Sequence, residues 1–256
     1  MQKLSLLLCT CLMAFSLQAQ KEGEILFKEV MKIEIQLPED SPIPIEELKK
    51  MMPSEQVSKQ VLYFTDKATL YTAEPQAEQA ESEFNHEGEG VRIQMKMVGA
   101  STENKVFVDL KKEQLIQQQD FMGKTFIVQD DEPKLPWKLG TEQKEILGYN
   151  CRQATATIDD REVEAWFTTE LAIPSGPANY YGLPGMILEV QSKSENGERK
   201  IIATAINEKA LEKDLLKAPN KGKKVTSEQY RKIVEEKTKE MQEQMGGRNG
   251  TFIIRG

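Results

Sequence analysis

The sequence predicts a mainly β protein, in which one curved antiparallel sheet of about ten strands, half-barrel-like, precedes a C-terminal helix. Short apolar segments recur roughly every dozen residues with turn-forming residues between them, which is typical of strands joined by hairpins. Helical character dominates only near the C-terminus. We therefore expect a signal peptide at 1–19, an antiparallel β domain at 20–225, and a helix with a tail at 226–256.

The first strands are indicated by the alternation of apolar and polar residues. In residues 25–37 the apolar side chains occupy odd positions, so that they share one face of a strand. Residues 57–65 and 68–74 are predicted to form the next hairpin. Residues 74–90 contain little to bury and are predicted as a mobile loop, and residues 91–99 then repeat the alternation. Three short strands follow, at 105–112, 114–121 and 123–131.

A tight turn at Asp159 and Asp160 predicts a hairpin between 149–158 and 162–169. A second hairpin is predicted between 185–193 and 199–207, because the Asn-Gly dipeptide at 196–197 favours a two-residue turn.

A two-residue turn in this second hairpin sets Glu189 opposite Thr204. It also sets Lys193 opposite Lys200, a like-charge pair that counts against this register.

The C-terminal helix is predicted to begin where Thr226 and Gln229 have the spacing of a capping box. A thin apolar stripe continues along this segment, and Gly246 and Gly247 are expected to end it.

The N-terminus has the features of a cleaved signal. An apolar block at 4–17 follows Lys3, and Ala19 offers a cleavage site, so we expect a mature protein in the periplasm or secreted. The block is shorter than the ~18 to 20 residues of a membrane-spanning helix, and we expect no integral membrane span. The net charge of −7 argues against a nucleic-acid partner. Cys151 alone would remain after cleavage, which excludes a disulfide scaffold.

The stretch "GPANYYGLPGMILEV" at 176–190 combines glycines, prolines and tyrosines ahead of an apolar run. We predict a type II turn over Leu183 to Met186, with Pro184 at its second position and Gly185 supplying the positive φ of its third. Gly182, Leu183, Pro184 and Gly185 are thus predicted to be a structural motif. No glycine-rich nucleotide-binding motif is present.

The segments "PWKL", "LGYNCRQA", "AWFTTELAIPSGP" and "YYGLPGMILEV" occur in this order, most firmly within 135–207. This ordered set resembles the GLPGLI family of exported, uncharacterised proteins of Gram-negative bacteria. The resemblance implies export to the cell envelope and a shared structural motif, and it supplies no catalytic residues.

Several residues are candidates for catalysis. Cys151 would need a histidine to act as a nucleophile, and His86 lies in a polar segment, so a small core residue is the better interpretation of Cys151. Paired carboxylates suit a glycosidase, and Glu164, Glu170 and Glu189 lie near the motifs. Desolvation on an apolar strand face would raise the pKa of Glu189, as in an acid catalyst, although a glutamate satisfied by Thr204 or a backbone donor is the simpler reading.

Soft-metal binding is a further hypothesis, because thioethers and a thiolate suit Cu(I). Methionines on a strand face or helix stripe more often fill gaps in a core, and one histidine with one cysteine is too few for zinc. The methionine pairs are Met51–Met52, Met95–Met97 and Met241–Met245.

Recognition by a surface loop is the interpretation that we favour from the sequence. Residues 171–182 are stiffened by two prolines and carry Tyr180 and Tyr181, with Trp166 just upstream, so these three rings are predicted to bind a ligand. We therefore expect a non-enzymatic exported binding protein for an envelope partner or an apolar ligand, without catalytic residues, metal or cofactor. The alternatives are an envelope copper-handling protein and a hydrolase.

Overall fold

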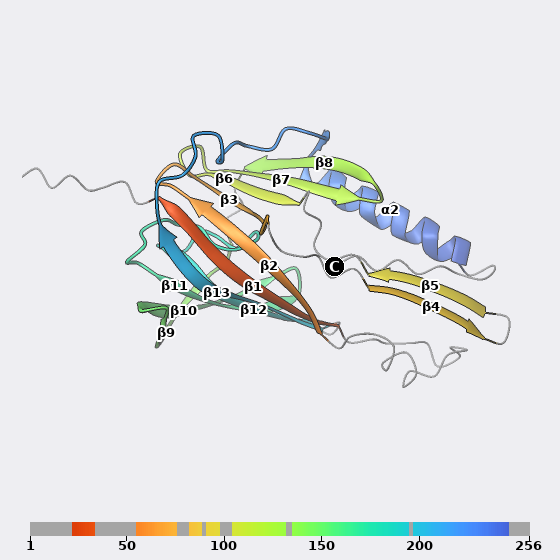
Figure 1. The fold of residues 1–256 in the computed structure, drawn as a ribbon, viewed down its shortest axis with the longest axis horizontal. Helices are drawn as coiled ribbons and strands as arrows, with labels where there is room; N and C mark the ends of the chain where they lie inside the picture. The colour runs from red at the N-terminus through yellow and green to blue at the C-terminus, as the bar shows by residue number, and fades with distance from the viewer. Residues whose placement is uncertain are drawn as a thin grey trace, which may run out of the picture.

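The computed structural model describes residues 22–33, 55–75, 82–88, 91–97, 104–131, 135–194 and 197–245. These residues form a 12-stranded sheet, a separate two-stranded sheet and one α-helix (Figure 1). The predicted fold, a mainly β protein with one antiparallel sheet and a C-terminal helix, is confirmed. The sheet has more strands than the ten expected, because residues 138–146 and 223–225 add unpredicted strands at its two ends.

The large sheet is antiparallel except for one parallel pair, β14 with β8. Its strands follow the order β14-β8-β7-β6-β3-β2-β1-β13-β12-β11-β10-β9. Their bounds are β1 Gly23–Ile33, β2 Glu55–Phe64, β3 Ala68–Ala73, β6 Lys105–Asp109, β7 Gln114–Phe121, β8 Lys124–Asp131, β9 Lys138–Ile146, β10 Tyr149–Ile158, β11 Arg161–Thr168, β12 Met186–Ser194, β13 Gly197–Glu208 and β14 Lys223–Val225.

The sheet curves strongly along this order. Figure 1 shows β6, β7 and β8 across the top, the diagonal strands β1, β2 and β13 in the middle, and β9, β10 and β11 at the lower left. Between β11 and β12 the chain leaves the sheet, and this connection, residues 169–185, supplies Leu171, Ile173 and Leu183 to the main core beside Phe27. The curved sheet therefore encloses a core that it shares with its own connecting segment. We call the sheet face that meets this core the inner face.

The connection is tied to the sheet by hydrogen bonds. The backbone N–H groups of Met186 and Ile187 donate to the carbonyls of Leu171 and Ser175, each at 2.9 Å. The hydroxyls of Ser175 and Thr69 on β3 lie 2.7 Å apart and are both buried. The connection is thus a fixed part of the interior.

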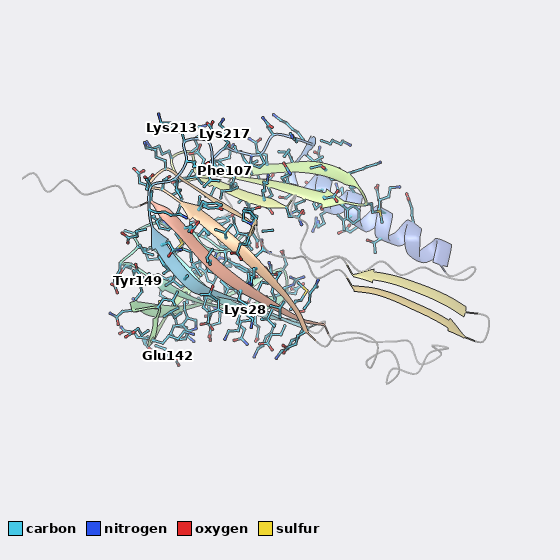
Figure 2. The ribbon with its side chains drawn as sticks, viewed as in Figure 1. Lys28, Phe107, Glu142, Tyr149, Lys213 and Lys217 are labelled. Carbon is cyan, nitrogen blue, oxygen red and sulfur yellow. The ribbon has the colours of Figure 1, made fainter. Side chains whose placement is uncertain are left out.

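The opposite face of β2, β3 and β6 is covered by the chain that follows β13. Leu211, Leu215 and Leu216 pack against a small cluster that includes Phe107. Figure 2 shows Lys213 and Lys217 of this segment beside Phe107 at the top of the molecule.

Two predicted hairpins are found, with one change of register. Asp159 and Asp160 adopt φ values of 48° and 60°, as a tight hairpin turn between β10 and β11 requires. In the hairpin of β12 and β13, however, Glu189 lies opposite Ile202 and Lys193 lies opposite Glu198. The predicted register is therefore wrong, and the observed one replaces the like-charge pair of lysines by an opposite-charge pair.

The segment predicted as a mobile loop contains a strand. β4, Ser82–Gly88, pairs antiparallel with β5, Val91–Met97, in the two-stranded sheet. The prediction for 74–90 is wrong over β4, because backbone pairing with β5 forms a strand from residues of low hydrophobicity.

The C-terminal helix α2, Ser227–Met245, begins as predicted. The N–H of Thr226 donates to Oε1 of Gln229 at 3.1 Å, and the N–H of Gln229 donates to Oγ1 of Thr226 at 3.2 Å. This reciprocal pair is a capping box. Tyr230 on α2 packs edge-on against Phe126 of β8, which joins the helix to the sheet. The predicted helix stop at Gly246 and Gly247 and the signal peptide at 1–19 lie outside the described residues.

Candidate functional site

The backbone of the Gly-Leu-Pro-Gly motif differs from the predicted turn. Gly182 has a positive φ of 86°, whereas Gly185 does not occupy the left-handed region. A Cβ on Gly185 would lie 2.0 Å from the carbonyl oxygen of Thr168. The type II turn centred on Pro184 and Gly185 is therefore wrong. Gly185 is required because the backbone at the end of β11 passes too close for a side chain.

The three rings predicted to bind a ligand are buried. Tyr180, Tyr181 and Trp166 are 6%, 1% and 7% exposed. Tyr181 packs on Leu115, and its carbonyl accepts a hydrogen bond from Nε1 of Trp137 at 2.8 Å. The expectation that Tyr180 and Tyr181 lie at a loop surface is wrong, because the connection turns inward to fill the curved sheet. The ligand-binding role of the three rings stays a prediction.

A polar pocket lies on the outer face of β10, β11 and β12 and at the start of β9, with a volume of about 490 Å³. Val163 and Ala165 of β11 are buried in the main core, so Glu162 and Glu164, which alternate with them, point to the opposite face. We call this the outer pocket. Its lining residues are Pro136, Lys138, Thr155, Ala156, Thr157, Glu162, Val163, Glu164, Gln191 and Lys193.

Strand pairing arranges the polar groups of the outer pocket in two rows. Thr155, Glu164 and Gln191 are paired across β10, β11 and β12. The next row holds Glu162 between Thr157 and Lys193. Carboxylates, hydroxyls, an amide and ammonium groups thus alternate at cross-strand distances, which offers both donors and acceptors to one ligand.

Glu164 is held in place by both of its oxygens. Nε1 of Trp166 donates to Oε1 of Glu164 at 2.9 Å, and Nε2 of Gln153 donates to Oε2 at 2.9 Å. The Trp166 ring is in turn covered by Nζ of Lys144, 4.2 Å from its centroid. The carboxylate therefore has a fixed orientation at the wall of the pocket.

Lys144 links this group to Glu189. Its Nζ lies 2.7 Å from Oε2 of Glu189, and Nζ of Lys200 lies 3.0 Å from Oε1. Burial raises the pKa of Glu189, but the hydrogen bonds and charges of Lys144 and Lys200 outweigh this effect and lower it below the usual value. The hypothesis of an acid catalyst with a raised pKa is thus wrong, since two lysines hold Glu189 ionised.

The structure therefore brings Glu164, Trp166 and Glu189 together, whereas Tyr180 and Tyr181 lie on the inner side. Lys144 and Gln153, which join these groups, were missed in the sequence. The alternation of polar positions 162 and 164 with buried positions 163 and 165 is the signal that marks the outer face of β11.

The other candidate residues lie apart from the outer pocket. Burial raises the pKa of the Cys151 thiol to about 11, and its Sγ lies 3.5 Å from the Tyr149 carbonyl, as expected of a core cysteine. Oε1 of Glu170 accepts a hydrogen bond from the N–H of Asn150 at 2.9 Å. His86 belongs to β4, but its side chain is outside the described set.

Among the described residues, no group of three or more His, Cys, Asp or Glu side chains is placed to hold a metal ion. The copper hypothesis, which depends on the methionine pairs, stays a prediction. Met95 and Met97 belong to β5, Met241 and Met245 to α2, and the side chains of all four lie outside the described set. Met51 and Met52 lie outside the described residues. In the same described ranges, no helix is long and apolar enough to span a membrane.

Comparison with known proteins places these elements in a family. The model of the family described as "N-glycanase peptide, N-terminal domain" matches residues 89–232, more than half of the 256-residue chain. A comparison with curated proteins gave no match.

The fold is similar to that of PNGF-II, which has been solved in two crystal forms. The C2 form superposes with a TM-score of 0.53 and 17% identity, over 84% of this chain and 33% of PNGF-II. The P21 form gives a TM-score of 0.52 with the same identity and coverage. At this identity the likeness shows the fold alone, and the chain spans about a third of the length of PNGF-II.

These findings overturn two expectations from the sequence. The resemblance to the GLPGLI family is wrong, because the family model that matches is a different one. The expectation of a non-enzymatic binding protein is wrong as well, because the matching family is the domain of an enzyme, an N-glycanase. With more than half of its residues matched, the chain belongs to the family of N-glycanase N-terminal domains.

Proposed function

We propose that this chain acts in the hydrolysis of N-glycan–peptide linkages, as the N-terminal domain of an N-glycanase, and that the outer pocket holds the saccharide. One observation carries the proposal: every residue that lines the outer pocket falls within the segment 89–232 that matches the family. Because the chain spans about a third of PNGF-II, we assign it a part in the hydrolase reaction and not the complete active site.

The chemistry of the outer pocket suits a sugar. Saccharide hydroxyl groups donate and accept hydrogen bonds at once, and they need partners of both kinds. The carboxylates of Glu162 and Glu164 accept, the ammonium groups of Lys138 and Lys193 donate, and the Gln191 amide does both. Two carboxylates and two ammonium groups also balance in charge, which favours a neutral ligand over an ionic one.

Glu164 is the residue on which this binding should depend most. Trp166 and Gln153 fix the direction of its carboxylate before any ligand arrives. Each oxygen of an ionised carboxylate has two acceptor positions, so the two internal hydrogen bonds leave acceptor capacity toward the pocket. A ligand hydroxyl that binds here meets a group whose side-chain entropy is already reduced.

The proposal is tested by titrating the protein with an N-glycosylated peptide and with the same peptide lacking the glycan, followed by NMR. We expect saturable binding of the glycosylated peptide alone, with shifts at β10, β11 and β12. The Glu164→Gln variant should bind about tenfold more weakly, as the loss of one charge-assisted hydrogen bond predicts. Glu142→Gln, an exposed change elsewhere on β9, is the matched control (Figure 2). Equal binding of the two peptides, or an unchanged Glu164→Gln variant, would refute the proposal.

A further inference from the structure

A second polar cavity, separate from the outer pocket, opens on the inner side of the sheet. It has a volume of about 300 Å³ and lies among β1, β2, β3, β6, β7, β13 and residues 178–179 of the inward connection. We call it the inner cleft. The charged residues of its lining are Glu29, Lys105 and Arg199, so the lining carries one net positive charge.

The one carboxylate of this lining already has partners within the protein. Nε of Arg199 donates to Oε1 of Glu29 at 2.7 Å, and the Tyr71 hydroxyl donates to Oε2 at 3.4 Å. Burial and the charge of Glu29 raise the pKa of Tyr71 well above its usual value, so this hydroxyl stays protonated and remains a donor. The negative charge of the inner cleft is therefore engaged by two donors.

Arg199 keeps most of its own donors available. A guanidinium carries five N–H groups in a fixed fork, and within the described ranges only Nε of Arg199 has a hydrogen-bond partner. Lys105, at the first position of β6, has no ion-pair partner in the same ranges. A partly buried guanidinium with open terminal nitrogens is suited to bind a carboxylate or a phosphate through two parallel hydrogen bonds.

Two carboxamides of the lining are oriented so that they add further donors. Oδ1 of Asn104 accepts the backbone N–H of Asp120 at 3.0 Å, and Oε1 of Gln117 accepts Nε2–H of Gln119 at 2.9 Å. In Asn104 and Gln117 the oxygen is thus engaged, whereas the NH₂ group has no partner among the described residues. Guanidinium and amide donors therefore line the inner cleft together, which favours an anionic group.

Two acceptors accompany these donors. Gln60 and Gln119 use their Nε2 groups toward the Ser58 hydroxyl, at 3.3 Å, and toward Gln117. Their carbonyl oxygens have no partner in the part of the chain that the structure describes. Gln60 is only 4% exposed, and a buried carbonyl oxygen without a donor is uncommon in folded proteins. A ligand of the inner cleft should therefore carry an N–H donor as well as a negative charge.

We infer that the inner cleft binds a small N-acylated amino acid, whose carboxylate accepts from Arg199 and whose amide N–H donates to Gln60 or Gln119. A monocarboxylate neutralises the single net positive charge of the lining. A dianion such as phosphate would exceed that charge, and a neutral ligand would leave it uncompensated. The volume of about 300 Å³ is at the lower end for small-molecule sites, which suits a ligand of this size.

This inference goes beyond the proposed function, because it concerns a different site and a different ligand. Glu29, Gln60 and Tyr71 lie outside the segment 89–232 that matches the family, whereas the outer pocket lies wholly within it. Glu29 follows Phe27 on the core face of β1, and Glu164 points to the opposite face of the sheet. A ligand bound at one site therefore does not contact the other.

The probe is N-acetylglycine, titrated into the ¹⁵N-labelled full chain and followed by NMR. We expect saturable shifts at β1, β13 and residues 117–119. N-acetylglycinamide has nearly the same shape but no charge, and it should bind at least about tenfold more weakly because the charge-assisted hydrogen bonds are lost.

Two variants test the residues that carry the inference. Gln117→Glu keeps the acceptor for Gln119 and replaces the donor NH₂ by a carboxylate oxygen, so N-acetylglycine should bind at least about tenfold more weakly. Arg199→Lys keeps a positive charge beside Glu29 but loses the fork, and it should weaken binding as well. Gln143→Glu makes the same change as Gln117→Glu at an exposed position of β9 outside both cavities, and is the matched control.

Thermal melting shows that each variant is folded before it is titrated. The inference is overturned if the shifts are absent, if the amide binds as tightly as the acid, or if either cleft variant binds like the parent. An equal loss of binding in Gln143→Glu would also overturn it, by placing the carboxylate away from the inner cleft. Failure of the proposed function reads differently, since it concerns the glycosylated peptide and the shifts at β10, β11 and β12.

Discussion

Gly185 lies against the backbone of Thr168 so closely that a Cβ at position 185 would be 2.0 Å from the Thr168 carbonyl oxygen and 2.8 Å from its carbonyl carbon. The contact joins the end of β11 to the start of β12 across the whole inward connection. The obstacle is main chain, so it cannot be relieved by rotating a side chain.

Gly185→Ala should therefore destabilise the protein strongly. The backbone must shift to admit a methyl group, which we expect to cost on the order of 2 kcal/mol or more. Thermal melting measures the loss. Gly182→Ala is the matched control: its φ is positive but nothing lies within 4 Å of the added Cβ, so it should cost only about 1 kcal/mol. Equal melting of the Gly185 variant and the parent would contradict the close approach.

Tyr181→Ala should also destabilise the fold. Its ring is 1% exposed and packs on Val108 and Leu115, so truncation leaves a cavity between the connection and the sheet. We expect a loss of about 3 kcal/mol in the free energy of unfolding, measured by chemical denaturation. A loss below ~0.5 kcal/mol would place the ring at the surface, where the sequence alone had suggested it.

Cys151 should react slowly with alkylating reagents in the folded protein. Burial raises the pKa of its thiol from 9.0 to about 11, so little thiolate forms at neutral pH. A folded-state pKa above the unfolded one also means that stability falls as the pH rises from about 9 toward about 11. Iodoacetamide labelling with and without urea checks the first point, and denaturation at several alkaline pH values checks the second. Rapid native labelling would contradict both.

Glu189→Gln should lower stability at neutral pH. The change leaves Lys144 and Lys200 without their shared carboxylate, and we expect a cost of about 1 kcal/mol. Because the pKa of Glu189 is lowered in the folded state, its contribution is present above the unfolded value of 4.5 and is lost as the pH falls through the folded one. Urea denaturation should thus give the variant a lower free energy of unfolding than the parent at pH 7, and similar values for both in acid. A difference in unfolding free energy between variant and parent that does not depend on pH would contradict this account.

Export can be tested on protein recovered from its native host. We predict that the mature chain begins at Gln20 and carries no lipid, because Ala19 ends the plausible cleavage site. Mass spectrometry of the N-terminal peptide decides between this and an acylated cysteine. An intact Met1, or a lipid on Cys9 or Cys11, would show that the signal was misread.

The sequence correctly predicted the elements that depend only on residues close together in the chain. The capping box of Thr226 and Gln229 and the turn at Asp159 and Asp160 depend on neighbouring residues, and both are found. The register of β12 and β13 depends in part on charges that meet across strands, as Lys193 and Glu198 do, and the turn alone indicated the wrong pairing.

The candidate site was likewise predictable only in part. The position of Glu164 and Glu189 near the motifs, and of Trp166 just upstream of the 171–182 loop, makes these three residues predictable from the sequence. Lys144 and Gln153, which connect them, reach the site from β9 and β10, and only the pairing of these strands with β11 brings them there. The inward path of residues 171–182 could not be predicted from local sequence either, because the shape of the whole sheet provides the space for Tyr181.

The position of β9 at one end of the open sheet has a consequence for how molecules meet. One side of this strand has no neighbour among the described strands, and an exposed row of backbone donors and acceptors invites a second chain to pair with it. Lys138, Glu142, Lys144 and Glu145 are spread along β9, and an incoming apolar strand would have to desolvate them. These charges therefore oppose pairing of a second chain with the free edge of the sheet, and so protect the protein from aggregation.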